Sequence, residues 1–244
     1  MTPRRASAPK PAEGEPDAAR QPATPKPAGR RPAPRRVSTR KALEHLRASD
    51  PVLARIIDET GKLPSSRAGR PDPGDHYGAL VRSIVGQQLS VLAARAIYGR
   101  LTERFGGRAP TPQEILDDEP EELRAAAGLS RAKVGFLRSL AEHVLSGELE
   151  LERLDSLPDE QVIDELVAVK GLGEWTVHMF LMFQLERPDV LAVGDLGIRR
   201  AIERAYGLDV LPQAAEIEAL AEPWRPYRTL ACRYLWRSLQ NEPG

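Results

Sequence analysis

Apolar residues recur every three or four positions from Lys41 to the end of the chain, the period of amphipathic helices. Alternating runs of β-branched residues, which would indicate strands, are scarce. The pattern therefore predicts an all-α chain of roughly ten helices with short connections. After one or two helices before residue 75, the expected helices include 77–85, 91–105, 112–116, 120–127, 131–145, 158–167, 174–185, 196–206, 212–221 and 227–240.

Helix-terminating and helix-capping residues support these boundaries. Ser49-Asp50-Pro51 offers a capping side chain followed by proline at the first helical position, and Gly61 ends the helix that follows. Ser90 is placed to cap the helix that begins at Val91. We expect no internal repeat.

The composition excludes several classes of protein. Among 244 residues, 41% are hydrophobic, but no run of about 18 apolar residues could span a bilayer. The single cysteine, Cys232, excludes an intrachain disulfide, a multi-cysteine zinc site and a four-cysteine iron-sulfur cluster. The start lacks the apolar stretch of a secretory signal. We therefore expect an intracellular protein, cytoplasmic or nucleoid-associated in a bacterium and nuclear in a eukaryote.

The net charge of zero conceals an asymmetry between the start and the remainder of the chain. Residues 1–40 hold 9 of the 22 prolines, and ten Lys or Arg against three Asp or Glu give them a net charge of +7. Such a segment buries too little apolar surface to offset chain ordering, so it is predicted to be a disordered basic arm. It would either add attraction to a polyphosphate or serve only as a solubilising tail.

The segment from Leu166 to Thr176 holds two glycines around one apolar residue, Gly171-Leu172-Gly173. Glycines let the chain turn tightly between two helices and leave backbone N–H groups accessible at the start of the second helix, a geometry suited to a DNA phosphate. Taken alone, the same pattern is compatible with an ordinary turn between helices.

Asp195 follows an apolar run and Gly194, about twenty residues after the hairpin, and precedes a predicted helix. An aspartate at this position commonly caps the helix. A carboxylate beside apolar walls could also stabilise a positive charge that develops on a substrate. The two roles are compatible.

The hairpin with Trp175-Thr176 and the downstream Gly194-Asp195 resembles the helix-hairpin-helix (HhH-GPD) DNA glycosylase superfamily. Three further segments are similar to its DNA-3-methyladenine glycosylase II branch: 80–90 with 93–95, 128–130 with Lys133, and 223–228 with Trp236. The ordered match runs from about residue 75 to 240. The resemblance implies a two-lobed helical fold, with one lobe of about 41–75 plus 190–244, the other of about 76–189, and the hairpin at 168–174.

The resemblance also implies roles for particular residues. Asp195 would be catalytic, at the mouth of a cleft between the lobes, and either Gln88 or Leu89 would fill the gap left by an extruded base. The base pocket would hold Trp175, Trp236 and Met179, and the DNA-binding hairpin would use Lys170, Gly171, Leu172, Gly173 and Thr176. The alternative for each tryptophan is core packing alone, and the alternative for Gln87 and Gln88 is hydrogen bonding to local backbone.

Departures from the superfamily narrow the activity. The lyase branch carries a lysine where this chain has Trp175, so no amine is available there for a Schiff base and the chain should be monofunctional. The adenine-mismatch branch carries an acidic residue at the position of Ser83, so that branch is disfavoured. Lys170 replaces the usual hairpin proline and adds a positive charge that would attract a phosphate. We expect no cofactor and no iron-sulfur cluster, with at most a monovalent cation at the hairpin when DNA is bound.

The resemblance therefore implies a base-excision repair enzyme that extrudes alkylated purines, such as 3-methyladenine and 7-methylguanine, from double-stranded DNA and hydrolyses their N-glycosidic bond. Cationic bases would be favoured by cation–π contact with the tryptophans. The alternatives are a glycosylase for neutral bases such as uracil or hypoxanthine, and a non-catalytic DNA-binding module. We expect a monomer that does not contact membranes.

Overall fold

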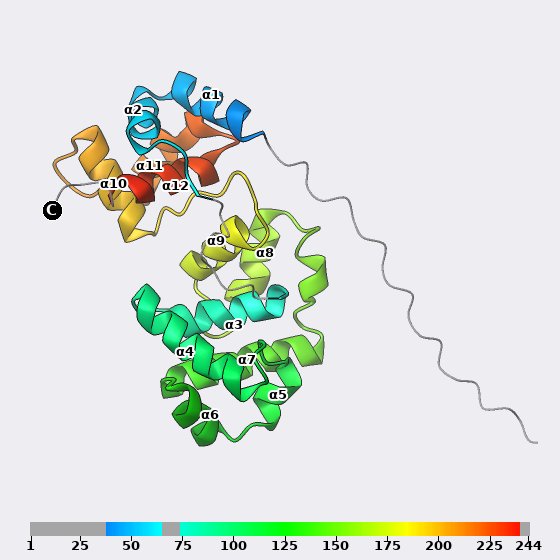
Figure 1. The fold of residues 1–244 in the computed structure, drawn as a ribbon. Helices are drawn as coiled ribbons and strands as arrows, with labels where there is room; N and C mark the ends of the chain where they lie inside the picture. Colours follow the sequence, from blue (N-terminus) through cyan, green and yellow to red (C-terminus); the bar gives the residue numbers. More distant parts are fainter. Residues whose placement is uncertain (1–37, 65–73, 240–244) are drawn as a thin grey trace, which may run out of the picture. The chain divides into compact units, whose positions relative to one another are not determined.

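The computed structural model describes residues 38–64 and 74–239, which contain twelve α-helices, two short 3-10 helices and no strand (Figure 1). This confirms the all-α prediction. The predicted arm, residues 1–40, lies outside the described residues except at its end, where Thr39 already begins the first helix. Within the described part, no helix combines the length and apolar character needed to cross a membrane.

The helices follow the predicted order, with boundaries within a few residues of those expected. The 3-10 helices are η1 (Leu151–Arg153) and η2 (Glu222–Trp224). The α-helices are α1 (Thr39–Ser49), α2 (Pro51–Thr60), α3 (His76–Gly86), α4 (Val91–Arg104), α5 (Pro112–Asp117), α6 (Pro120–Ala127), α7 (Arg131–Ser146), α8 (Asp159–Val167), α9 (Glu174–Phe183), α10 (Leu196–Tyr206), α11 (Ala214–Ala221) and α12 (Arg228–Ser238).

Capping explains why these helices begin where they do. The carboxylate of Asp50 accepts hydrogen bonds from two backbone N–H groups at the start of α2, and Pro51 occupies the first helical position. The hydroxyl of Ser90 accepts from the Ala93 N–H at the start of α4. Gly61 ends α2 with a φ of 68°, a conformation that favours glycine. The predicted caps are confirmed.

One set of contacting helices consists of α1, α2, α10, α11, α12 and η2. At its centre lies a buried carboxylate, Asp50, which accepts hydrogen bonds from the Tyr206 hydroxyl at 2.5 Å and from the Trp224 indole at 2.8 Å. The Trp224 side chain is fully buried. These contacts tie α2, the end of α10 and η2 together, because each supplies one member of the cluster.

A second set runs from α3 to α9, with α3 in contact with α4, α7 and α9 (Figure 1). Seven of the eleven residues of α3 are buried, in keeping with its central position in this set. Helices α8 and α9 pack on each other and are joined by the turn that contains Gly171. The predicted division into two lobes with the stated boundaries stays a prediction.

The segment between α9 and α10 carries Asp195 and is held by α12. Arg228 donates from Nε to the Asp189 carboxylate at 2.8 Å, and Arg225 donates to the same carboxylate at 2.7 Å. The Thr229 hydroxyl accepts from the Val190 N–H at 3.0 Å and donates to the Arg187 carbonyl at 2.7 Å. These bonds fix the backbone that leads to the candidate catalytic carboxylate.

Candidate active site

Asp195 lies at the start of α10 with its carboxylate bound by three N–H donors. Oδ1 accepts from the Ile198 backbone N–H at 2.8 Å, which makes Asp195 the N-cap of α10. Oδ1 also accepts from Nε1 of Trp236 at 2.7 Å, and Oδ2 accepts from Nε1 of Trp175 at 2.7 Å. Both oxygens are thus fixed in direction, and the residue is only partly buried. The predicted capping role is confirmed.

Gly197 makes room for this arrangement. A Cβ atom at this position would lie 2.9 Å from Oδ1 of Asp195 and 3.1 Å from Cδ1 of Trp236. A side chain would therefore push the indole away from the carboxylate. No sequence signal marks Gly197, because its neighbour Trp236 lies far away in the sequence.

The two tryptophans differ in their surroundings. The Trp236 ring stacks on Phe183, with ring centroids 6.2 Å apart and planes inclined by 29°, so Phe183 covers part of its surface. Trp175 is 46% exposed, which is unusual for so large an apolar side chain. Core packing alone therefore does not describe Trp175.

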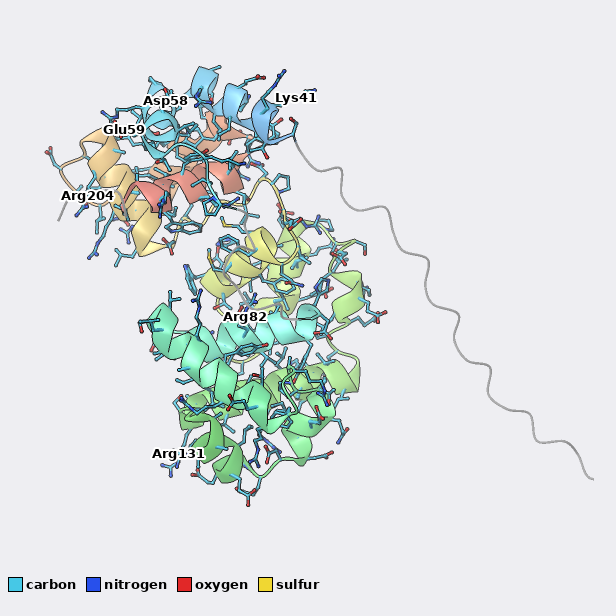
Figure 2. All side chains as sticks on the ribbon, in the orientation of Figure 1. Lys41, Asp58, Glu59, Arg82, Arg131 and Arg204 are labelled. Carbon is cyan, nitrogen blue, oxygen red and sulfur yellow. The ribbon has the colours of Figure 1, made fainter. Side chains whose placement is uncertain are left out.

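A pocket of about 290 Å³ opens between α3, α4 and α9. Met179, the third predicted base-pocket residue, lines it together with Phe183, whereas Trp175 and Trp236 are not among its lining residues. Arg82, labelled in Figure 2, lines the pocket from α3, and Arg95 lines it from α4. Met179 and Phe183 therefore line a pocket apart from the tryptophans, although Met179 lies one helical turn after Trp175 on α9 and Phe183 stacks on Trp236.

The hairpin turn requires glycine at its first position. Gly171 has a φ of 95°, and a Cβ atom there would lie 2.6 Å from Cδ1 of Phe136 on α7. Gly173, the N-cap of α9, has an ordinary φ of −84° and no atom within 4 Å of a built Cβ. The second glycine is therefore not required by contacts among the described residues.

The other predicted hairpin residues divide into exposed and buried ones. Lys170 is exposed, beside a groove that Trp175 also lines. The side chains of Leu172 and Thr176 are buried, and the Thr176 hydroxyl lies 3.3 Å from Nε2 of Gln87. Neither side chain is therefore available to an external phosphate.

The predicted wedge lies in the loop between α3 and α4. Gln88 is exposed with a φ of 55°, and Leu89 is 38% exposed. Gln87 does not bond to local backbone: its Nε2 donates to the Gly171 carbonyl of the hairpin at 2.8 Å. Lys133 Nζ donates to the carbonyls of Val85 and Gln87, a role that the sequence motif did not indicate.

The hairpin offers backbone carbonyl oxygens, which suit hard cations. One of them, the Gly171 carbonyl, already accepts from Gln87. Among the residues with described positions, no group of three or more His, Cys, Asp or Glu could hold a metal ion. The cation stays a prediction.

Comparison with known proteins identifies a family and several relatives of this chain. Residues 81–226 match the model of the HhH-GPD superfamily of base excision DNA repair proteins. The chain is 35% identical over 203 residues to DNA-3-methyladenine glycosylase 1 of Schizosaccharomyces pombe, covering 82% of this chain and 88% of that protein. It is 30% identical over 189 residues to DNA-3-methyladenine glycosylase 2 of Escherichia coli, covering 72% and 63% respectively.

Solved structures of similar proteins share the fold of this chain. The S. pombe enzyme Mag1 in complex with abasic DNA has a TM-score of 0.74 at 34% identity, covering 82% of this chain and 97% of that one. A DNA-3-methyladenine glycosidase from Bacillus halodurans has a TM-score of 0.69 at 38% identity, covering 82% and 89%. Because the family model matches more than half of the chain, the chain belongs to the HhH-GPD superfamily of base excision DNA repair proteins.

Proposed function

We propose that this chain is a monofunctional DNA glycosylase that hydrolyses the N-glycosidic bond of alkylated purines in double-stranded DNA. The observation that carries the proposal is the Asp195 carboxylate, which accepts hydrogen bonds from two indole N–H groups and one backbone N–H. One of the two indoles belongs to Trp175, whose side chain is half-exposed. The names of its relatives, which include several DNA-3-methyladenine glycosylases, support the substrate class. We expect it to act as a monomer.

The main barrier to base release is the positive charge that develops on the sugar as the C1′–N bond breaks. The bonding electron pair leaves with the base, a water oxygen bonds C1′, and the proton of that water passes to Asp195 or to solvent. A carboxylate already fixed by three donors needs no reorientation when the oxocarbenium ion forms, which is the condition for electrostatic stabilisation. Asp195 supplies that negative charge.

The leaving base sets how much further assistance is needed. A purine alkylated at N3 or N7 carries positive charge and leaves as a neutral molecule, so protonation by an acid is not required. The exposed ring of Trp175 would attract a cationic base through its electron-rich face. Phe183 covers part of the Trp236 ring, which leaves less of it for such contact.

Duplex DNA would be held at the hairpin. Gly173 is the N-cap of α9, and its missing side chain would leave the N–H groups of the first turn of α9 open to a phosphate oxygen. The exposed Lys170 adds positive charge beside them. Mag1, a structural neighbour, is in complex with abasic DNA. The exposed Gln88 and Leu89 would fill the space of the extruded nucleotide.

No lyase step is included in the proposal, because a Schiff base needs a free amine at the sugar. Trp175 occupies the position of the lyase lysine. The product should be an intact strand with an abasic site. The single Cys232 is buried, and burial raises the pKa of its thiol to about 12, so we assign it no chemical role.

The test is base release from three duplexes that contain 7-methylguanine, hypoxanthine or uracil, each measured with and without borohydride present during the reaction. We expect release from the methylated duplex, intact strands and no covalent adduct. Release from only the neutral bases would favour the alternative specificity. Binding without release from any duplex would favour a non-catalytic module, and a trapped adduct would contradict the monofunctional assignment.

A further inference from the structure

Helix α7 holds the wedge loop and the hairpin from one side. Lys133 Nζ lies 2.7 Å from the Val85 carbonyl and 2.9 Å from the Gln87 carbonyl, at the C-terminal end of α3. One turn further along α7, the ring of Phe136 fills the space that a side chain at Gly171 would need. Residues three apart share a helix face, so one face of α7 supports both loops.

The two loops are also joined directly. Nε2 of Gln87 donates to the Gly171 carbonyl at 2.8 Å and lies 3.3 Å from the Thr176 hydroxyl. The next residue, Gln88, adopts a φ of 55° that non-glycine residues rarely adopt. Gln87, the residue before the exposed tip, is therefore held at two points. Its side chain donates to the hairpin, and its carbonyl accepts from Lys133.

The chemistry at Lys133 suits a fixed support. An ammonium group at a helix C-terminus is attracted by the unpaired carbonyls there, and bonds from a charged donor are stronger than neutral ones. The side chain is half-buried, and this desolvation lowers the pKa of Lys133. Both carbonyl contacts are to the backbone, so they do not depend on the side chains of the loop.

We propose that Lys133 is a positioning residue for base extrusion: it holds the Gln88–Leu89 tip at a fixed place relative to the phosphate-binding hairpin. The inference rests on the proposed function. Nothing in the contacts of Lys133 places it at the reacting sugar, so its effect should fall on extrusion and not on bond cleavage. A tip that is no longer held would fill the gap less well, and the nucleotide would return to the stack more often.

The inference can be tested by changing the partner base opposite the damaged base. A base opposite a stable partner must break its pair before it is extruded, whereas a base opposite an abasic analogue has no pair to lose. Loss of the wedge support should therefore slow single-turnover release of 7-methylguanine opposite cytosine more than release of the same base opposite tetrahydrofuran. A defect in the chemical step would slow both substrates by the same factor.

The test compares Lys133→Met with Lys133→Arg and with a control on the same helix. Arg138 is a suitable control, because its guanidinium also donates from α7 to backbone carbonyls, those at the end of α5. For Lys133→Met we expect about a tenfold or greater loss on the paired substrate and at most about a threefold loss on the unpaired one. Lys133→Arg should recover most of the rate, and Arg138→Met should not separate the two substrates.

A second variant covers the case in which Lys133→Met does not fold. Gln87→Met removes the bond to the Gly171 carbonyl and should show the same dependence on pairing. Fluorescence of 2-aminopurine next to the lesion reports unstacking without any cleavage, and it should rise less on binding to each variant than to the native chain. Equal losses on both substrates, or unchanged fluorescence, would overturn the inference. An absence of base release by the native chain would instead count against the proposed function.

Discussion

Nε1 of Trp236 lies 2.7 Å from Oδ1 of Asp195, so the indole acts on the carboxylate as a hydrogen-bond donor. Trp175 does the same to the other oxygen at the same distance. The resemblance to the superfamily implied that both rings are walls of a base pocket. Their N–H groups add a second role, because they fix the direction of the negative charge at the candidate active site.

A comparable arrangement lies at Asp50. This carboxylate caps α2 and accepts from the Trp224 indole and the Tyr206 hydroxyl, yet the group is buried and Trp224 is fully enclosed. Asp50 therefore shows that the same kinds of donor can surround a carboxylate that is buried away from solvent. Asp195 differs in its partial exposure and in the half-exposed ring of Trp175.

Replacing each tryptophan by phenylalanine removes the N–H donor and keeps an aromatic ring. We expect Trp236→Phe and Trp175→Phe each to slow single-turnover base release by about tenfold, since a hydrogen bond to a charged group contributes roughly 1.5–3 kcal/mol. The loss should be similar for cationic and neutral bases, because it acts through Asp195. Rates on 7-methylguanine and hypoxanthine measure this directly.

Trp224→Phe is the matched control, since it removes an indole donor from Asp50. It should lower the free energy of unfolding by about 1–3 kcal/mol and leave the release rate of the folded protein unchanged. Native release rates in both Trp236→Phe and Trp175→Phe would show that their hydrogen bonds to Asp195 are not used in the reaction.

The two hairpin glycines should respond differently to alanine. Gly171→Ala places a side chain against Phe136 at a positive φ, so we expect a loss of about 2–4 kcal/mol in stability. Gly173→Ala meets no described neighbour and should leave thermal unfolding almost unchanged. Its methyl group would lie beside the N–H groups of α9, so affinity for undamaged duplex should fall.

Thermal unfolding and fluorescence anisotropy with a labelled duplex separate these two effects. A Gly173→Ala protein that binds duplex as tightly as the native chain would remove the argument that the second glycine admits a phosphate.

The capping residues of the sequence predicted the helical framework well. Local signals such as Asp50-Pro51, Ser90 and Asp195 involve side chains that bond to the backbone two or three residues later. Such contacts depend on short spacing alone, so they can be inferred without knowledge of the tertiary fold.

The side-chain network of the site could not be predicted in this way. Trp236 meets Asp195 across 41 residues and Lys133 meets Gln87 across 46, and no spacing rule brings such residues together. The resemblance assigned Thr176 to the DNA-binding hairpin, and in the structure its side chain is buried beside Gln87. A sequence motif marks these positions without telling which partner each side chain takes.

Stability in acid should depend in part on Glu114, which closes the capping box of α5. Hydrogen bonds from Arg108 and Thr111 lower the pKa of Glu114 to about 2. Because folding lowers the pKa of Glu114, its charged carboxylate stabilises the folded chain at pH values above the pKa of a glutamate in the unfolded chain. This stabilisation is lost as the pH falls through the pKa of Glu114 in the folded chain. The stability difference between native chain and Glu114→Gln should therefore be largest above about pH 5 and shrink toward pH 2. A difference that is constant over this range would contradict the assignment.

The central claim is that the charge of Asp195 stabilises the reacting sugar. Asp195→Asn keeps an oxygen that can cap α10 and accept from Trp236, while its new NH₂ group would face the Trp175 N–H. The most direct measurement is the single-turnover rate of 7-methylguanine release, with lesion-DNA affinity measured in parallel. We predict at least about a hundredfold loss in rate with affinity largely retained. A rate within a few-fold of the native chain would show that Asp195 is only a helix cap.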